Sequence, residues 1–256
     1  MQKYKVIFGL LVLVSILFTA CGGKNGNDGS TNGGNIFSNT EDVGESANEF
    51  LSDGNFNTLA IEVDYVEGFQ PTQSALNNLR SFLQARLNKP GGISITLDDE
   101  IPSPGMSPYT AQEAFDLEKE HRNTFTEGNT ISAYFLILDG EFEQENVLGF
   151  AYFNTSMALL GGTIEDNSGG FNQPSRETVE TAVLQHEFGH ILGLVNNGTP
   201  AVQDHVDEEN EAHCDVESCL MYFAVRTSGF MTNLMGGNVP ELDAQCIQDL
   251  QANGGK

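Results

Sequence analysis

The feature that most constrains this chain is a cluster of histidines in its last third. Four of its five histidines lie between positions 186 and 213, and two of them stand four residues apart in the run H-E-F-G-H at 186–190. Side chains four residues apart share one face of a helix, so His186 and His190 can bind the same metal ion. Glu187 borders that face as a candidate general base. The spacing therefore predicts a helix that carries two zinc ligands and a carboxylate.

The residues around this run also favour a helix. Ser175 is the expected N-cap, and Val179 and Val183 begin an apolar stripe. Gly193, three residues after the second histidine, allows the positive φ with which a helix ends and the chain turns back. A zinc ion at the two histidines would lower the pKa of its bound water from 15.7 to roughly 7, so that a neighbouring carboxylate can take the proton.

Residues 186–193 resemble the signature of the metzincin clan of zinc endopeptidases, H-E-x-x-H-x-x-G-x-x-H followed by a Met-turn. His186, Glu187, His190 and Gly193 match this signature, whereas Asn196 stands where the third histidine is expected. Amide side chains are poor zinc ligands, so the third ligand must come from elsewhere.

A second segment, residues 213–222, resembles the stretch from the third ligand to the Met-turn in matrixins and archaemetzincins. In both families the methionine lies eight residues after the third histidine, and here Met221 lies eight after His213 but sixteen after His205. The resemblance therefore implies His213 as the third ligand, with His205 as the alternative. It also implies an insertion, residues 195–212, and a Met221 that underlies the zinc site as an apolar floor.

The cysteines give a further prediction. The archaemetzincins carry a second zinc on four cysteines closed by C-x-x-C, whereas here Cys246 has Asp249 where its partner would stand. In an oxidising compartment two of the three cysteines that follow Cys21 are expected to pair. We therefore predict a disulfide in place of a second zinc, with Cys214 and Cys219 as the nearest pair in the sequence.

The pattern of apolar residues predicts one α+β domain over residues 58–256. Strands are expected at 59–65, 93–97, 130–138 and 147–154, and helices at 72–88, 110–123, from 175 onward and at 239–251. This order indicates a mixed sheet with helices packed against it. The metzincin resemblance implies a twisted sheet above a zinc cleft, followed by the active-site helix, the Met-turn and a C-terminal helix.

The N-terminus reads as an export signal. Lys3 and Lys5 precede an apolar run, residues 6–18, that is shorter than the roughly 20 residues of a membrane-spanning helix. Residues 18–21, Phe-Thr-Ala-Cys, resemble a bacterial lipobox. The resemblance implies that residues 1–20 are a lipoprotein signal peptide and that Cys21 carries lipid such as palmitate. The exported protein would then lie on the periplasmic or cell-surface side of a bacterial membrane, with residues 21–57 as a flexible tether and linker.

The charge of the chain excludes some partners. The sequence holds 36 Asp and Glu against 11 Lys and Arg, a formal net charge of −25. Such a charge repels phosphate backbones and anionic headgroups, which argues against nucleic acid and leaves the lipid anchor as the only expected membrane contact.

The acids form two local clusters: Asp204, Asp207, Glu208, Glu209 and Glu211 in the insertion, and Glu141, Glu143 and Glu145 in an expected hairpin. Either cluster could bind Ca²⁺, with solvated surface as the default. Gluzincins take their third zinc ligand from a downstream glutamate, so Glu208, Glu209 or Glu211 is another alternative to His213, although Gly193 and the Met221 spacing argue against it.

The metzincin resemblance implies a membrane-anchored zinc endopeptidase that hydrolyses a peptide or protein substrate with metal-activated water. One zinc would be held by His186, His190 and His213, with Glu187 as the base. Two alternatives stand beside it. One is a gluzincin-type protease, and the other is a non-catalytic surface lipoprotein that binds a partner or polymer and uses zinc structurally.

Overall fold

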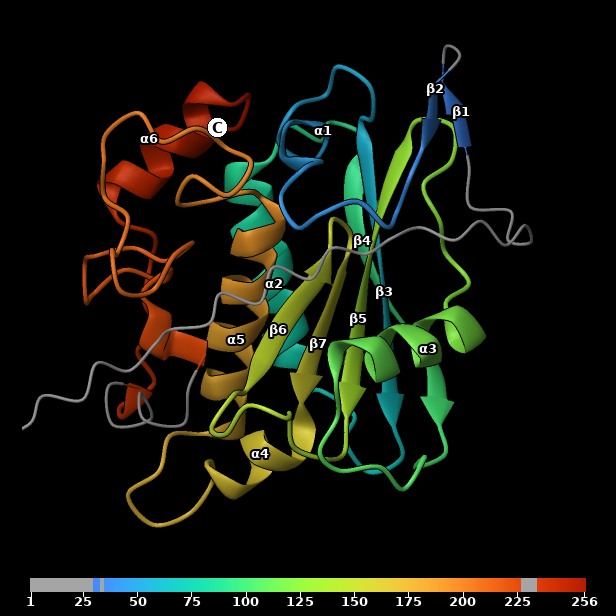
Figure 1. The fold of residues 1–256 in the computed structure, drawn as a ribbon, viewed down its shortest axis with the longest axis vertical. Helices are drawn as coiled ribbons and strands as arrows, with labels where there is room; N and C mark the ends of the chain where they lie inside the picture. The colour runs from blue at the N-terminus through green and yellow to red at the C-terminus, as the bar shows by residue number, and fades with distance from the viewer. Residues whose placement is uncertain (1–29, 33–34, 227–233) are drawn as a thin grey trace, which may run out of the picture.

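The centre of the protein is a five-stranded mixed sheet with the strand order β4-β3-β5-β7-β6 (Figure 1). In the computed structural model, which describes residues 30–32, 35–226 and 234–256, four strands run parallel, and β6 pairs antiparallel with β7 and forms one edge. The α+β class is confirmed. The strands are β3 (Thr58–Val66), β4 (Gly92–Ile101), β5 (Thr130–Leu138), β6 (Gly149–Phe153) and β7 (Ser156–Leu160).

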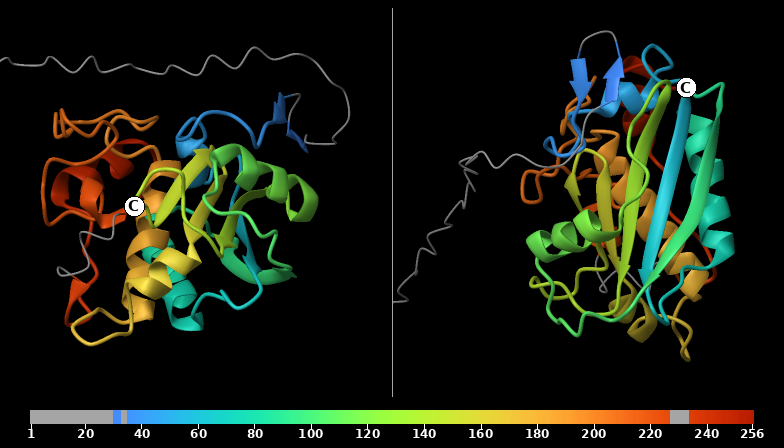
Figure 2. Two further views of the ribbon diagram at one scale, coloured as in Figure 1. Left: turned by 60° about the horizontal axis from the view of Figure 1, so that its bottom comes forward. Right: turned by 90° about the vertical axis from the view of Figure 1, so that its right-hand side faces the viewer.

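Helices cover both faces of this sheet. α2 (Gln73–Arg86) and α3 (Ala111–His121) lie on opposite sides of it (Figure 2, right). Successive residues of a strand point to opposite faces, so β5 supplies Phe135 to the larger core under α2 and α5 (Arg176–Ile191), and Tyr134 and Leu136 to the smaller core under α3. The result is a three-layer arrangement in which both faces of the central strands are buried.

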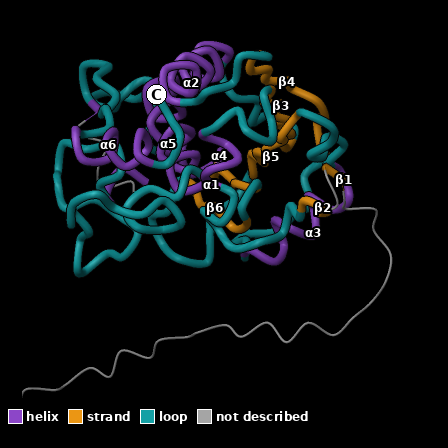
Figure 3. The backbone as a smooth tube through the Cα atoms, turned by 90° about the horizontal axis from the view of Figure 1, so that it is seen from above, coloured by secondary structure: helices purple, strands orange, loops and turns teal. Residues whose placement is uncertain are grey.

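Helix α5 separates the sheet from the C-terminal part of the chain (Figures 1 and 3). Every residue from 178 to 191 is buried, because the sheet covers one side of the helix and the loops around α6 (Ala244–Ala252) and the short 3₁₀ helix η1 (Phe223–Arg226) cover the other. The Ser175 side chain accepts a hydrogen bond from the Thr178 backbone N–H at 3.1 Å, which caps α5 as predicted.

The folded domain begins upstream of residue 58. Residues 21–57 are predicted above as a tether and linker, but the structure places a short helix, α1 (Ala47–Leu51), in the larger core. Phe50 is fully buried and packs edge-to-face on Phe188 of α5, with ring centroids 5.7 Å apart. The prediction was wrong here because the few apolar residues of this segment show no helical or strand period. A short hairpin, β1 (Ser30–Asn32) and β2 (Asn35–Phe37), precedes them.

The segment with Glu141, Glu143 and Glu145 is not a hairpin, because β7 lies between β5 and β6 in the sheet. β7 was missed because all five of its residues are buried, which removes the alternation that marks a half-buried strand. The next residues form α4 (Gly161–Asp166).

The predicted signal peptide, residues 1–20, and the predicted lipidation site, Cys21, lie outside the described residues. Within the described part of the chain, no helix has the length and apolar character needed to cross a bilayer.

Candidate metal centre

Helix α5 presents His186 and His190 on one face. Their Nε2 atoms lie 3.2 Å apart, and the two rings are nearly perpendicular, with centroids 4.9 Å apart. In a tetrahedral zinc site with Zn–N bonds of 2.0–2.1 Å, two nitrogen ligands are about 3.3 Å apart. The two histidines are therefore already at the separation that one zinc ion requires.

His213 joins this pair from the loop after the insertion. Each of the three histidines places one ring nitrogen within 4.8 Å of a ring nitrogen of the other two. The His213 ring centroid is 5.4 Å from that of His186 and 4.9 Å from that of His190. His205 belongs to a different group, so the structure brings His213 and not His205 to the helix pair.

Backbone carbonyls orient two of the three rings. His186 Nδ1 lies 2.7 Å from the Leu220 carbonyl, and His213 Nδ1 lies 3.0 Å from the Glu211 carbonyl. A carbonyl oxygen can only accept, so both Nδ1 atoms carry the proton and both Nε2 lone pairs point toward the group. Three imidazoles whose ring nitrogens converge in this way are a donor set that fits zinc.

Glu187 lies between α5 and the edge strand β6. Its side chain is fully buried, and a Cβ atom placed on Gly149, the first residue of β6, would be 3.1 Å from Glu187 Oε1. The carboxylate is therefore held next to the two histidines at the start of the edge strand. The sequence predicts the position of Glu187 on the helix but not its contact with β6.

Met221 packs directly against the helix between the two histidines. A Cβ on Gly189 would collide with Met221 Sδ, so only glycine at this place of the H-E-F-G-H run permits the contact. Met221 is fully buried, and its carbonyl accepts the Cys214 backbone N–H at 2.8 Å. That bond ties the Met221 floor to the residue that follows His213. Sequence reasoning missed the role of Gly189, which only the packing reveals.

The chain leaves α5 as predicted, through Gly193 at φ +67°. The Gly193 carbonyl accepts the Thr199 N–H at 2.8 Å, and the Thr199 hydroxyl donates to the Leu192 carbonyl at 2.7 Å. Asn196, at the position where the metzincin signature has its third histidine, is exposed on this turn. The chain therefore leaves the histidine site after Gly193, passes through the insertion, and comes back to helix α5 at His213.

Comparison with a solved archaemetzincin structure shows the fold. The structure is similar to the crystal structure of archaemetzincin from Methanopyrus kandleri, with a TM-score of 0.51 and 14% sequence identity over 78% of this chain and 96% of that chain. The protein has an archaemetzincin-like fold. It is also similar to metalloproteinase-II from Bacteroides fragilis, with a TM-score of 0.45 and 15% identity over 79% of this chain and 54% of that chain, so it spans about half of that protein. No family model matches the sequence.

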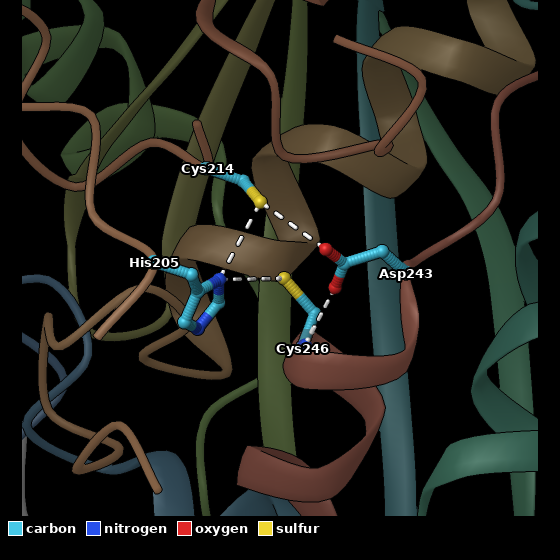
Figure 4. A group of neighbouring side chains, drawn as sticks. All are labelled: His205, Cys214, Asp243 and Cys246. Atoms are coloured by element: carbon cyan, nitrogen blue, oxygen red, sulfur yellow. Dashed lines mark hydrogen bonds between the residues drawn. The ribbon is translucent and has the colours of Figure 1, made fainter. Parts of the chain in front are cut away.

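The three cysteines after residue 21 are free thiols in the structure, so the predicted Cys214–Cys219 disulfide is not formed there. The Cys219 and Cys246 sulfurs lie 3.6 Å apart. The pKa of the Cys219 thiol is lowered, because its sulfur is hydrogen-bonded to the neighbouring thiols of Cys214 and Cys246 and accepts two backbone N–H groups. His205 lies beside Cys214 and Cys246 (Figure 4).

The acids of the insertion stay apart from the histidines. Among the described residues they form no close group of potential metal ligands with one another or with His186 and His190, and neither do Glu141, Glu143 and Glu145. Asp207 instead accepts the backbone N–H groups of Glu209 and Asn210. The pKa of the Asp207 carboxyl is lowered, mainly because it also accepts a hydrogen bond from the Asn210 side-chain amide. The structure therefore gives no support to a calcium site there or to a third ligand from Glu208, Glu209 or Glu211.

Proposed function

We propose that the protein is a zinc-dependent endopeptidase. The observation that carries this proposal is the convergence of His186, His190 and His213, with Glu187 beside them, on a fold shared with archaemetzincin. Catalytic zinc sites use three protein ligands and leave the fourth position to water or substrate. His186, His190 and His213 supply that number of ligands.

The residues of the site have distinct roles in this proposal. Bound zinc would polarise the scissile carbonyl and acidify the attacking water. The Glu187 carboxylate, next to His186 on α5, would serve as the general base that holds a proton and passes it to the leaving amine. Leu220 and Glu211 hold the rings of His186 and His213 through their carbonyls. Met221 packs against Gly189, between His186 and His190 on the helix.

The edge strand β6 offers a binding surface for the substrate. Among the described residues, β6 is the edge strand of the sheet and pairs with β7, so its other edge can pair with an extended peptide backbone. Gly149 at the start of this strand lies against Glu187, which would bring the bound peptide close to the proposed base. The net charge of −25 favours basic or neutral peptides over acidic ones.

The non-catalytic alternative makes a different prediction about the metal. A structural zinc has a closed, four-ligand site, and its removal would change stability without any loss of peptide cleavage. Treatment with a chelator should abolish cleavage of a peptide library, and zinc should restore it. The variant His213→Ala should lose this zinc and the activity together. Cleavage that persists in the metal-free protein would contradict the proposal.

We further propose that Cys21 is acylated and anchors the exported protein to a bacterial membrane. This rests on the lipobox-like residues 18–21 and the basic and apolar residues before them. The variant Cys21→Ala should lose incorporation of labelled palmitate and move from the membrane to the soluble fraction. A variant that stays in the membrane fraction, or a wild type without label, would refute the anchor.

A further inference from the structure

A cavity of about 410 Å³ lies between α2, α5 and residues 237–242, the segment that leads into α6. Helix α2 packs along α5 (Figures 1 and 3), and the segment closes the third side. The lining includes Arg86 and Phe82 from α2, Gln185 from α5, and Glu241 and Leu242 from the segment. A volume of this size and a lining of mixed polarity are typical of a site for a small organic ligand.

This cavity lies behind the histidine site. Gln185 stands one position before His186, so the two side chains point about 100° apart around the axis of α5. The described residues that line the cavity include neither Glu187 nor any of the three histidines. The Leu220 backbone lies between the two sites, because its N–H donates to the Glu241 carbonyl at 2.9 Å and its carbonyl lies 2.7 Å from His186 Nδ1. A ligand in the cavity would therefore not touch the proposed zinc.

The α2 side of the cavity is basic in a strongly acidic protein. Residues 68–97 contain no Asp or Glu but three cations, Arg80, Arg86 and Lys89, although the whole chain has 36 acids. No ion pair among the described residues involves Arg86, and residues 227–233 contain no acid in their sequence.

The Arg86 guanidinium keeps donors that the described part of the protein does not use. Its Nε is buried and has no hydrogen-bond partner there. Its central carbon lies 5.9 Å from the centroid of the Phe82 ring, which also lines the cavity. A guanidinium matches the planar, two-oxygen geometry of a carboxylate. Arg86 therefore favours a ligand with a carboxylate group.

Gln185 adds a buried acceptor to the same cavity. Its side chain is 9% exposed, and its Nε2 donates to the Asn78 carbonyl at 3.4 Å. Asn78, which also lines the cavity, donates through Nδ2 to Thr181 Oγ1 at 3.2 Å. Among the described residues, neither Gln185 Oε1 nor Asn78 Oδ1 receives a hydrogen bond. An amide oxygen can only accept, so a matching ligand carries N–H donors as well as its carboxylate.

We propose that the cavity binds the C-terminal residue of a peptide or of an N-acylated amino acid. The carboxylate would pair with Arg86, the N–H would donate to the amide oxygen of Gln185 or Asn78, and the side chain would lie against the apolar wall of Phe82 and Leu242. Glu241, the one acid among the described lining residues, would weaken this binding by repulsion. The site involves no zinc and no bond cleavage, so it does not depend on the proposed peptidase activity.

The test is isothermal titration calorimetry of the full-length protein with N-acetyl-leucine. We expect binding at one site per chain, with N-acetyl-leucinamide and inorganic phosphate each at least about 10-fold weaker, because one lacks the charge and the other lacks the N–H and the apolar body. Equal binding of the amide or of phosphate would overturn the proposal, as would no heat with N-acetyl-leucine at millimolar concentrations.

A second titration separates the cavity from the histidine site. Zinc-free wild type and the double variant His186→Ala/His190→Ala should bind N-acetyl-leucine as zinc-loaded wild type does, with the folded state of each checked by urea unfolding. Loss of binding in both folded proteins would place the ligand at the zinc and contradict the proposal.

Single variants test the cavity residues. Arg86→Gln should weaken N-acetyl-leucine binding at least about 10-fold. Arg80→Gln is the matched control on the same helix, because Arg80 Nη1 donates to Asn77 Oδ1 at 3.3 Å and Arg80 does not line the cavity. Glu241→Gln removes the repelling charge and should tighten binding about 2- to 5-fold. Equal weakening in Arg86→Gln and Arg80→Gln would show a general charge effect and would contradict the assignment of Arg86.

Discussion

Gly189 and Met221 are in direct contact across the floor of the histidine site, and a Cβ atom on Gly189 would collide with Met221 Sδ. Gly189→Ala should therefore displace either Met221 or the turn of α5 that carries both histidines. We expect a loss of about 1–3 kcal/mol in the free energy of unfolding and weaker zinc binding. Urea denaturation and a zinc competition assay measure the two effects. Gly54→Ala, at an open position, is the control, and equal behaviour of the two variants would contradict the close contact.

The N-terminal segment should contribute to the stability of the domain. Phe50 is fully buried against Phe188, so Phe50→Ala should cost about 3–5 kcal/mol in the free energy of unfolding. Phe171→Ala removes a side chain that is 96% exposed and should change stability by less than about 0.5 kcal/mol. Thermal or urea unfolding distinguishes them. If Phe50→Ala is as harmless as Phe171→Ala, the domain does begin near residue 58.

A buried ion pair joins α3 to the sheet. Arg122 Nη1 lies 2.6 Å from Glu118 Oε1, and the guanidinium also donates to Ser132 and Thr155. Removing one charge leaves the other buried without its partner, so Arg122→Ala should cost about 3–5 kcal/mol.

A double-mutant cycle separates this pair from ordinary packing. The variant Glu118→Gln/Arg122→Met should lose less stability than the sum of its single variants. The exposed pair of Asp116 and Lys119 is the control, since its disruption should cost at most about 1 kcal/mol. Additive effects at Glu118 and Arg122 would contradict strong coupling.

Asp64 should make stability depend on pH. Burial raises the pKa of its carboxyl to about 6, against hydrogen bonds from the Asp99 backbone N–H and the Tyr134 hydroxyl. Between about pH 4 and pH 6 the folded state therefore holds a proton that the unfolded state has lost. The contribution of Asp64 falls as pH rises through this window, by about 2 kcal/mol.

Unfolding at pH 4 and pH 7 tests this sign. Asp64→Asn mimics the protonated form, so relative to wild type it should gain about 2 kcal/mol in stability on going from pH 4 to pH 7. Asp204→Asn, at an exposed acid, should show no such gain. A parallel pH dependence of wild type and Asp64→Asn would exclude the raised pKa.

Local rules explain what the sequence could predict. Ser175 caps α5 as predicted, and the helix expected at 110–123 begins with a capping box of Thr110 and Glu113. Alternating apolar residues mark β3, and β5 has its expected bounds because its residues are rich in aromatic and β-branched types. The spacing of eight residues between His213 and Met221 predicts His213 as the third ligand. The structure places His213 beside His186 and His190.

The remaining features depend on contacts between segments distant in the sequence. Helix α1 has only five residues, and it is held by packing on α5 and not by a period of its own. Gly189 contacts Met221, and His205 is hydrogen-bonded to Asp249. In both cases the two residues are more than 30 positions apart, so a local sequence pattern does not predict the contact. The free thiols near His205 follow from the same long-range packing.

The central claim is that Glu187 assists peptide hydrolysis at a zinc held by His186, His190 and His213. The most direct measurement is cleavage of an internally quenched peptide library by zinc-loaded wild type and Glu187→Gln, with zinc content determined on the same samples. Glu177→Gln, an exposed position on the same helix, is the control. We predict unchanged zinc in all three proteins and a loss of about 10²- to 10⁴-fold in kcat/KM for Glu187→Gln alone. Equal cleavage by wild type and Glu187→Gln would contradict the account.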